Sequence, residues 1–118
     1  MTGKDEERRF LSLLGLCRKA GRLIVGSDLA CEAMGKRARV RLAVLSDGAS
    51  ENTKKRIRTK TAFYGIPLLT VSLSPVVIGA AVGKGEIAVC AVTDENFSKE
   101  LIRMELTGKE TSQSEGGV

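Results

Sequence analysis

Leu42-Ala43-Val44-Leu45, followed at once by Ser46-Asp47-Gly48-Ala49-Ser50, is the stretch of sequence that decides the fold. Four consecutive apolar residues with no polar alternation are typical of a strand that is covered on both faces. The Ser, Asp and Gly residues that follow predict a turn and the N-cap of a helix. A strand that is buried on both faces and leads directly into a helix indicates a sheet between two layers of helices.

Helices and strands alternate on both sides of this stretch. Apolar residues at helical spacing predict a helix over 6–20 and a basic helix over 51–64 with Ile57, Thr61 and Tyr64 inward. Further strands are expected at 23–25, 68–71 and 87–92, and further helices at 27–35, 76–82 and after Asp94. The expected fold class is α/β: a single three-layer α/β/α sandwich, with helices on both faces of a mixed sheet of about four strands.

The chain length and composition predict one domain. The chain has 118 residues, of which 42% are hydrophobic, and this is enough for a single core. We expect the domain to span 1–106 and residues 107–118, which offer no apolar face, to form a disordered tail whose deletion barely changes the melting temperature.

The sequence shows no sign of a membrane segment or of export. No apolar stretch reaches the roughly 18 to 20 residues that cross a bilayer, and the charged first residues do not resemble a secretory signal. We therefore expect a cytoplasmic protein without a membrane partner. The cysteines at 17, 31 and 90 have neither a disulfide nor a metal-knuckle spacing, and we expect buried, reduced thiols.

The residue types that most enzymes use are missing. The chain has no histidine, which removes the commonest general base and zinc ligand. The spacing of Gly79, Gly83 and Gly85 matches neither a Walker loop nor a GxGxxG turn, and no histidine is available to activate a serine. The protein is therefore not expected to be an enzyme, and no catalytic residue, metal site or cofactor is predicted.

The basic charge points to a polyanionic partner. The net charge is +5, and residues 1–60 hold 15 of the 19 Lys and Arg residues. The aromatic residues fall in predicted helices, which disfavours the stacking of bases on a sheet. The remaining mode of binding is recognition of structured RNA through its backbone charge and through helix N-termini. The basic face at 54–60 fits either such a contact or an ordinary solvated surface.

Three blocks in one register resemble a known family. They are Leu13 to Asp28 (LLGLCRKAGRLIVGSD), Asp47 to Lys55 (DGASENTKK) and Ile78 to Gly83 (IGAAVG). Together they resemble the YlxQ-type bacterial branch of the ribosomal protein L7Ae/L30e family over about residues 8–105. The resemblance implies an α/β/α domain that binds kink-turn RNA, an internal bulge flanked by sheared G·A pairs.

The resemblance also implies an RNA-contacting helix N-terminus. In that family a strand ends at a Gly, and the next helix directs its N-terminus into the bent RNA. The matching positions, Gly26, Ser27, Asp28, Leu29 and Glu32, retain the Gly and a small second residue. Asp28 stands where an amide or Lys is common, Leu29 where Glu or Gln is common, and Glu32 where Lys is common.

The remaining expected contacts flank this motif or lie in a second loop. Gly26 is expected to allow close approach, and Ser27 and Asp28 to cap the helix and read a base edge. The family's second contact loop corresponds to Lys84, Gly85 and Glu86. Phosphates are expected to be held by Arg22, Lys36, Arg37 and Lys84.

Three functional hypotheses follow. The first is non-catalytic binding of structured RNA, either kink-turn or bulged RNA in ribosomal RNA or an mRNA leader, by a monomer associated with the ribosome or translation. The second is a protein-interaction module that contacts ribosomal or translation-factor proteins and no RNA. The third is an isolated substrate-recognition domain like those fused to RNA methyltransferases, although this chain has no room for the catalytic half.

Overall fold

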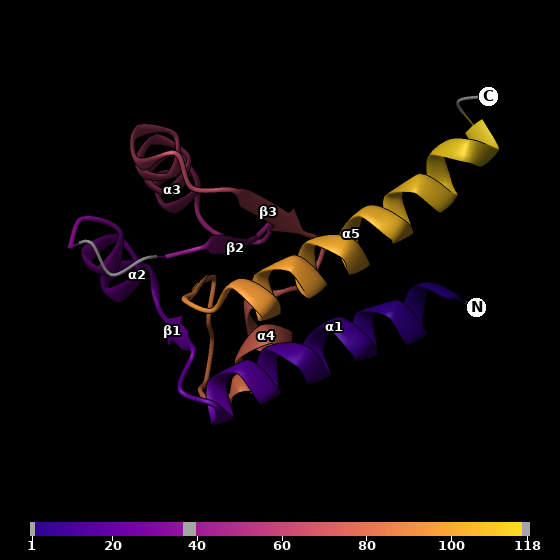
Figure 1. The fold of residues 1–118 in the computed structure, drawn as a ribbon, viewed down its shortest axis with the longest axis horizontal. Coiled ribbons are helices and arrows are strands. Elements are labelled where there is room, and N and C mark those ends of the chain that lie inside the picture. Colours follow the sequence, from indigo (N-terminus) through magenta and orange to yellow (C-terminus); the bar gives the residue numbers. More distant parts are fainter. Residues whose placement is uncertain (1, 37–39, 117–118) are drawn as a thin grey trace.

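The computed structural model describes the backbone of residues 2–36 and 40–116 and the side chains of residues 4–36 and 40–105. Helices and strands alternate along this part of the chain in the predicted order (Figure 1). The elements are α1 (Thr2–Lys19), β1 (Leu23–Val25), α2 (Ser27–Met34), β2 (Leu42–Ser46), α3 (Glu51–Tyr64), β3 (Leu68–Val71), α4 (Pro75–Val82), β4 (Val89–Val92) and α5 (Glu95–Gly116).

The four strands form one mixed sheet in the order β1-β4-β2-β3. β4 is antiparallel to both β1 and β2, whereas β2 and β3 are parallel. The carboxyl ends of β1, β2 and β3 and the amino end of β4 therefore lie at the same edge. The segments at this edge, which we call the loop end, are 26–28, 47–50, 72–74 and 83–88.

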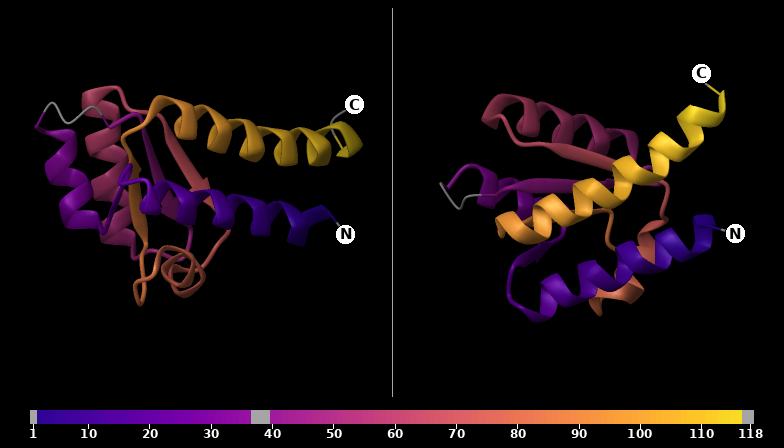
Figure 2. Two further views of the ribbon diagram at one scale, coloured as in Figure 1. Left: turned by 60° about the horizontal axis from the view of Figure 1, so that its bottom comes forward. Right: turned by 45° about the vertical axis from the view of Figure 1, so that its right-hand side comes forward.

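Helices cover both faces of the sheet, which confirms the predicted α/β/α sandwich. α2 and α3 lie on one face, and α1, α4 and α5 cover the other (Figure 2). Leu42 and Val44 of β2 pack toward α1, α4 and α5, whereas Ala43 and Leu45 pack toward α2 and α3. Successive strand residues point to opposite faces, so the uninterrupted apolar run of β2 supplies both cores.

α1 and α5 lie side by side, and the start of α1 and the end of α5 lie on the same side of the molecule (Figures 1 and 2). The backbone of α5 continues as a helix to Gly116, through a stretch for which the sequence predicts no ordered element. The side chains of 106–118 lie outside the described residues. A melting temperature that is insensitive to deletion of 107–118 stays a prediction.

Tyr64 corrects one detail of the predicted core. Ile57 and Thr61 are buried as expected, but Tyr64 is 41% exposed. Tyr64 is the last residue of α3, and Gly65 ends the helix with a left-handed φ of 67°. The tyrosine side chain lies against Gly35 at the end of α2 instead of entering the core.

The three cysteines are free and buried, as the sequence predicts. Burial is the main cause that raises the pKa of Cys17 to about 11 and that of Cys90 to about 12. Both groups are therefore neutral thiols at physiological pH. In the part of the chain that the structure describes, none of the helices has the length and hydropathy of a membrane span.

Candidate nucleic-acid interface

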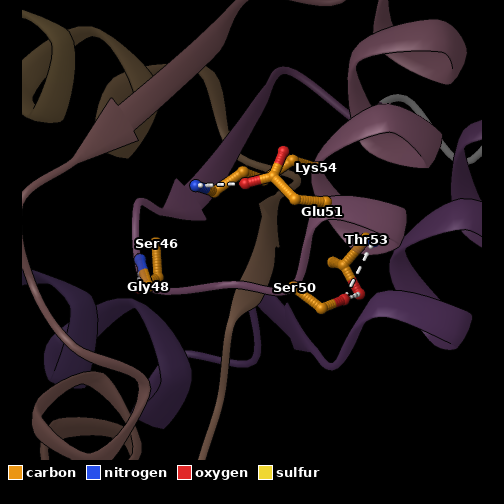
Figure 3. A network of polar contacts seen from close by, with 6 residues as sticks. All are labelled: Ser46, Gly48, Ser50, Glu51, Thr53 and Lys54. Atoms are coloured by element: carbon orange, nitrogen blue, oxygen red, sulfur yellow. Dashed lines mark hydrogen bonds and ion pairs between the residues drawn. The ribbon is translucent and has the colours of Figure 1, made fainter.

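Three helices, α2, α3 and α4, begin at the loop end, and two of them have a serine N-cap. The Oγ of Ser50 accepts a hydrogen bond of 3.1 Å from the N–H of Thr53 and donates one of 3.0 Å to the Thr53 hydroxyl (Figure 3). The Oγ of Ser74 accepts a bond of 3.2 Å from the N–H of Val77, and Pro75 follows at the start of α4. Each cap satisfies one of the N–H groups that a helix N-terminus leaves unpaired.

The third helix, α2, begins without a side-chain cap. Its N-cap is Gly26, with a φ of 103° and a ψ of 144°. The prediction that Ser27 and Asp28 cap this helix is wrong, because both residues follow the N-cap and lie in the first turn. The connection from Val25 to the helix is a single residue, and a left-handed φ at that residue favours glycine. The first-turn N–H groups of α2 thus carry the positive end of the helix dipole without a side-chain acceptor.

Hydrogen bonds hold Gly26 and its surroundings in place. The N–H of Gly26 donates to the carbonyl of Val89 over 2.8 Å, which joins this turn to the start of β4. The N–H of Ser46 donates to the carbonyl of Ala88, also over 2.8 Å. The turn before α2 and the segment before β4 are therefore neighbours on a fixed sheet edge.

The turn between β2 and α3 is built around a buried serine. Ser46 is fully buried, and its hydroxyl donates to the carbonyl of Leu73 over 2.6 Å and accepts from the N–H of Gly48 over 3.0 Å. Figure 3 shows this turn leading into the capped start of α3. A Cβ on Gly48 would lie 3.1 Å from Pro75, so the turn also packs closely on the start of α4.

The second predicted contact loop, with the exposed residues Lys84, Gly85 and Glu86, also lies at the loop end. It is anchored to α4, because the N–H of Lys84 donates to the carbonyl of Gly79 over 2.9 Å. A Cβ on Gly79 would overlap the carbonyl oxygens of Lys84 and Gly85. The structure thus brings this loop and the Gly26 turn to one edge of the sheet.

Sequence reasoning missed the ion pair that joins α2 to α3. Arg56 donates to the Asp28 carboxylate over 2.7 Å, and this bond raises the pKa of Arg56. The two residues are 28 positions apart, and nothing in the sequence pairs them. With Leu29, Cys31, Glu32 and Lys60 they line an open depression beside the start of α2.

Leu29 and Glu32 lie at the surface of α2. Leu29 is 55% exposed. Glu32 forms an ion pair of 3.5 Å with Lys36, four residues further along the chain. The negative charge of Glu32, which stands where the family often has Lys, is therefore partly compensated within α2 itself.

Two of the predicted phosphate contacts lie away from the loop end. Arg22 precedes β1, and Lys36 follows Gly35, the C-cap of α2. Because α2 has eight residues and is about 12 Å long, Lys36 lies near the opposite edge of the sheet from Gly26. Arg37 lies outside the described residues.

No metal site is evident in the described residues, since they contain no group of three or more Cys, Asp or Glu residues that could hold an ion. What the loop end offers is backbone N–H groups, an exposed carboxylate and exposed cations. Such groups bind phosphates and base edges.

Comparison with known proteins assigns the chain to a family. The model of the ribosomal protein L7Ae/L30e/S12e/Gadd45 family matches residues 8–102. The RNA-binding protein YlxQ of Bacillus subtilis (strain 168) is 37% identical over 95 residues, covering 80% of this chain and 93% of the relative. The RNA-binding protein YlxQ of Enterococcus faecium is 29% identical over 97 residues, covering 82% and 91%.

Solved structures share the fold. A protein with unknown function from Bacillus halodurans C is 36% identical and superposes with a TM-score of 0.73, covering 80% of this chain and 94% of that one. The Giardia lamblia 15.5kD RNA binding protein is 14% identical and has a TM-score of 0.69 over 86% and 89%. On the match to residues 8–102 and on these relatives, the chain belongs to the ribosomal protein L7Ae/L30e/S12e/Gadd45 family.

Proposed function

We propose that this protein binds structured RNA without catalysis and prefers bent or bulged RNA of the kink-turn type to a straight duplex. The observation that carries the proposal is the N-terminus of α2, which begins at Gly26 with no side-chain cap and lies at the same sheet edge as the 84–86 loop. The names of two curated relatives, both RNA-binding proteins, support it. We place this function in the cytoplasm, on ribosomal RNA or an mRNA leader, as part of the same proposal.

The α2 N-terminus supplies the main contact in this proposal. Among the described residues, no atom outside the chain neighbours of Gly26 lies within 4 Å of where its Cβ would stand, so an RNA backbone has room to approach. The N–H groups of the first turn then donate to a phosphate or to a base edge, aided by the helix dipole. A straight duplex offers phosphates at this point but not an opened groove.

Asp28 supplies base discrimination. Its side chain is 88% exposed, so the carboxylate is free to accept a hydrogen bond from an N–H of a base that is turned outward. When Asp28 turns to a base, Arg56 loses its partner and becomes available to a phosphate. The ion pair therefore acts as a resting state that RNA replaces.

The Lys84–Glu86 loop supplies the second contact. The loop is attached to Gly79 of α4, so it offers a second contact that is already anchored to the domain when RNA binds. An RNA that fits between two fixed contacts must already be bent, or must bend at low cost. Lys84 holds a phosphate on this side.

The test compares a kink-turn RNA with a straight duplex of equal length at two salt concentrations. We expect tighter binding of the kink-turn RNA at both, with a salt slope that corresponds to a few phosphates. Equal affinity for the two RNAs would reduce the interaction to general electrostatics. A slope near zero, with no measurable affinity, would favour a protein partner instead.

A pair of variants localises the contact. Asp28→Ala should weaken the kink-turn RNA by about 5-fold or more and the duplex much less, since a base-edge contact carries about 1 to 3 kcal/mol. The matched control is Glu95→Ala, which also removes an exposed, ion-paired carboxylate from the first turn of a helix but lies at the opposite sheet edge. Equal losses in both variants would exclude a base contact at Asp28.

A further inference from the structure

An exposed aromatic pair ends α3. Phe63 is 79% exposed and Tyr64 is 41% exposed, and their ring centroids lie 4.8 Å apart with planes at 88°. The Phe63 ring is not part of the hydrophobic core, since Ile57 and Thr61 are the residues on the buried side of this helix. Because the two rings are in contact, they form one exposed aromatic patch, and a contiguous exposed apolar patch points to a use in binding.

The pair is fixed to the domain. The Tyr64 hydroxyl lies 3.2 Å from where a Cβ would stand on Gly35, so the tyrosine rests on the end of α2. Phe63 packs against this anchored ring in an edge-to-face arrangement and presents most of its surface to solvent. The Phe63 ring thus has one ring contact within the domain and an exposed surface that a ligand can reach.

Cations line the path to these rings. α3 carries five basic residues and one acidic residue. Arg56, Lys60 and the rings follow one another at intervals of three and four residues, which places them on one side of the helix. Among the described residues Lys60 has no ion pair, and Lys55 and Arg58 beside it are exposed and also have none. We call Arg56, Lys60, Phe63 and Tyr64 the α3 strip.

The α3 strip is continuous with the loop end. Arg56 bonds to Asp28 in the first turn of α2, and both Arg56 and Lys60 line the depression beside Leu29. From Arg56 to Phe63 the helix rises by about 10 Å. An RNA strand that leaves the N-terminus of α2 therefore meets two cations and then an exposed ring.

We propose that the α3 strip binds a single-stranded RNA segment that extends from the structured RNA held at the loop end, with Arg56 and Lys60 on phosphates and a base stacked on Phe63. This inference rests on the proposed function for the structured part of the RNA. Cations beside an exposed aromatic ring are the combination that binds single strands without base preference. The aromatic residues of the sequence disfavour a stacking platform on the sheet, and the α3 strip places the ring on a helix instead.

The experiment compares three RNAs: the kink-turn core, the same core with a single-stranded extension, and the extension alone. The extension should raise the affinity of the core by about 5-fold or more, the lower end of what one base stacked on an aromatic ring contributes. Phe63→Ala should abolish this gain and leave the affinity for the bare core unchanged. Because Phe63 is largely exposed, the variant should keep the wild-type melting temperature.

Two matched controls separate stacking and charge from general effects. Leu16→Ala removes another exposed apolar side chain, 55% exposed on α1, and should leave the gain intact. Lys60→Gln should lower the gain and its salt dependence, whereas Lys99→Gln on α5 should not. A gain that persists in Phe63→Ala overturns the inference.

A spectroscopic readout is built into the chain. Tyr64 is the single tyrosine and there is no tryptophan, so intrinsic fluorescence reports on the α3 strip alone. Binding of the extended RNA should quench it more than binding of the bare core, after correction for RNA absorbance with a free tyrosine amide. Equal quenching by the two RNAs counts against the inference.

The outcomes distinguish the two proposals. If the core binds and the extension adds nothing, the α3 strip is not an RNA surface and the proposed function stands. If the extension alone binds through Phe63 and the core does not, the α3 strip is an RNA surface and the proposed function fails. If no RNA binds, both fail, and an acidic protein becomes the expected partner of the α3 strip.

Discussion

The N-terminus of α2 differs from the N-termini of α3 and α4 in whether a side chain caps its free backbone N–H groups. All three helices begin at the loop end after a strand, but α3 and α4 are capped by Ser50 and Ser74, whereas α2 begins at Gly26 with no side-chain cap. A serine cap contributes about 1 kcal/mol to stability. At α2 this contribution is absent, and the same N–H groups are available to an anion.

Chain length explains how this difference arises. The connections before α3 and α4 span 47–50 and 72–74, long enough to bring a serine into the extended backbone of an N-cap. The connection before α2 is Gly26 alone. A one-residue turn sets a backbone conformation that L residues rarely adopt, so the open helix end is a consequence of the short connection.

The largest expected effect tests the attachment of the 84–86 loop to α4, at the same sheet edge as the open end of α2. Gly79→Ala places a Cβ on the carbonyl oxygens of Lys84 and Gly85, which are backbone atoms that cannot turn aside. Such overpacking costs about 1 to 3 kcal/mol or more. We expect a fall of many degrees in the melting temperature and a loss of RNA affinity through displacement of the loop.

Gly85→Ala is the matched control for that change. A Cβ on Gly85 meets nothing within 4 Å in the part of the chain that the structure describes, and Gly85 has no left-handed φ. The melting temperature of this variant should stay within about a degree of the wild type. A similar fall in both variants would mean that the loop tolerates no substitution and that packing on Gly79 is not the cause.

The next effect concerns the turn that leaves α2 open. In Gly26→Ala the added methyl group has space, but a φ of 103° strains any L residue. Strain of this kind costs about 1 to 3 kcal/mol, and a thermal melt measures it. We expect kink-turn affinity to fall with it, because a relaxed backbone at 26 turns the first N–H groups of α2 away. Unchanged stability would show that the turn relaxes without cost.

The comparison of the three helix starts is tested directly by serine substitutions. Ser50→Ala and Ser74→Ala should each cost about 1 kcal/mol of unfolding free energy, since each removes a cap. Ser27→Ala, in the first turn of α2, should cost much less, because Ser27 caps nothing. Denaturant unfolding of the three variants gives the order. A loss at Ser27 as large as at Ser50 would mean that α2 is capped after all.

Most of the fold could be predicted from the sequence because burial on two faces leaves a clear pattern. The run at 42–45 is apolar at every position since Ala43 and Leu45 face one core while Leu42 and Val44 face the other. The strand order β1-β4-β2-β3 was beyond such reasoning, because it depends on which strands meet after the chain has folded back.

The candidate site could be predicted only where its residues are close in sequence. The Gly26 turn and the 84–86 loop were proposed as two segments because of the family resemblance, and the sheet topology brings both to the loop end. The ion pair between Asp28 and Arg56 was missed, because its geometry depends on how α2 and α3 pack. The exposure of Phe63 was missed for a similar reason. Helical spacing does not show that the Tyr64 ring contacts Gly35 at the end of α2, or that the Phe63 ring beside it stays exposed to solvent.

The smallest expected effect changes charge near the open helix end and leaves the fold alone. Glu32→Lys removes a carboxylate one turn from the start of α2 and releases Lys36, its partner at 3.5 Å. If RNA phosphates lie there, affinity should rise, and the slope of log affinity against log salt should steepen by up to about one unit, with the largest gain at low salt.

Glu95→Lys is the matched control, because Glu95 pairs with Lys99 at 3.2 Å in the same spacing but lies at the opposite sheet edge. Since both variants change the net charge equally, a steeper slope in Glu32→Lys alone measures a local contact. An equal change in both would mean that only the overall charge of the protein matters, and this result would contradict RNA binding at the uncapped end of α2.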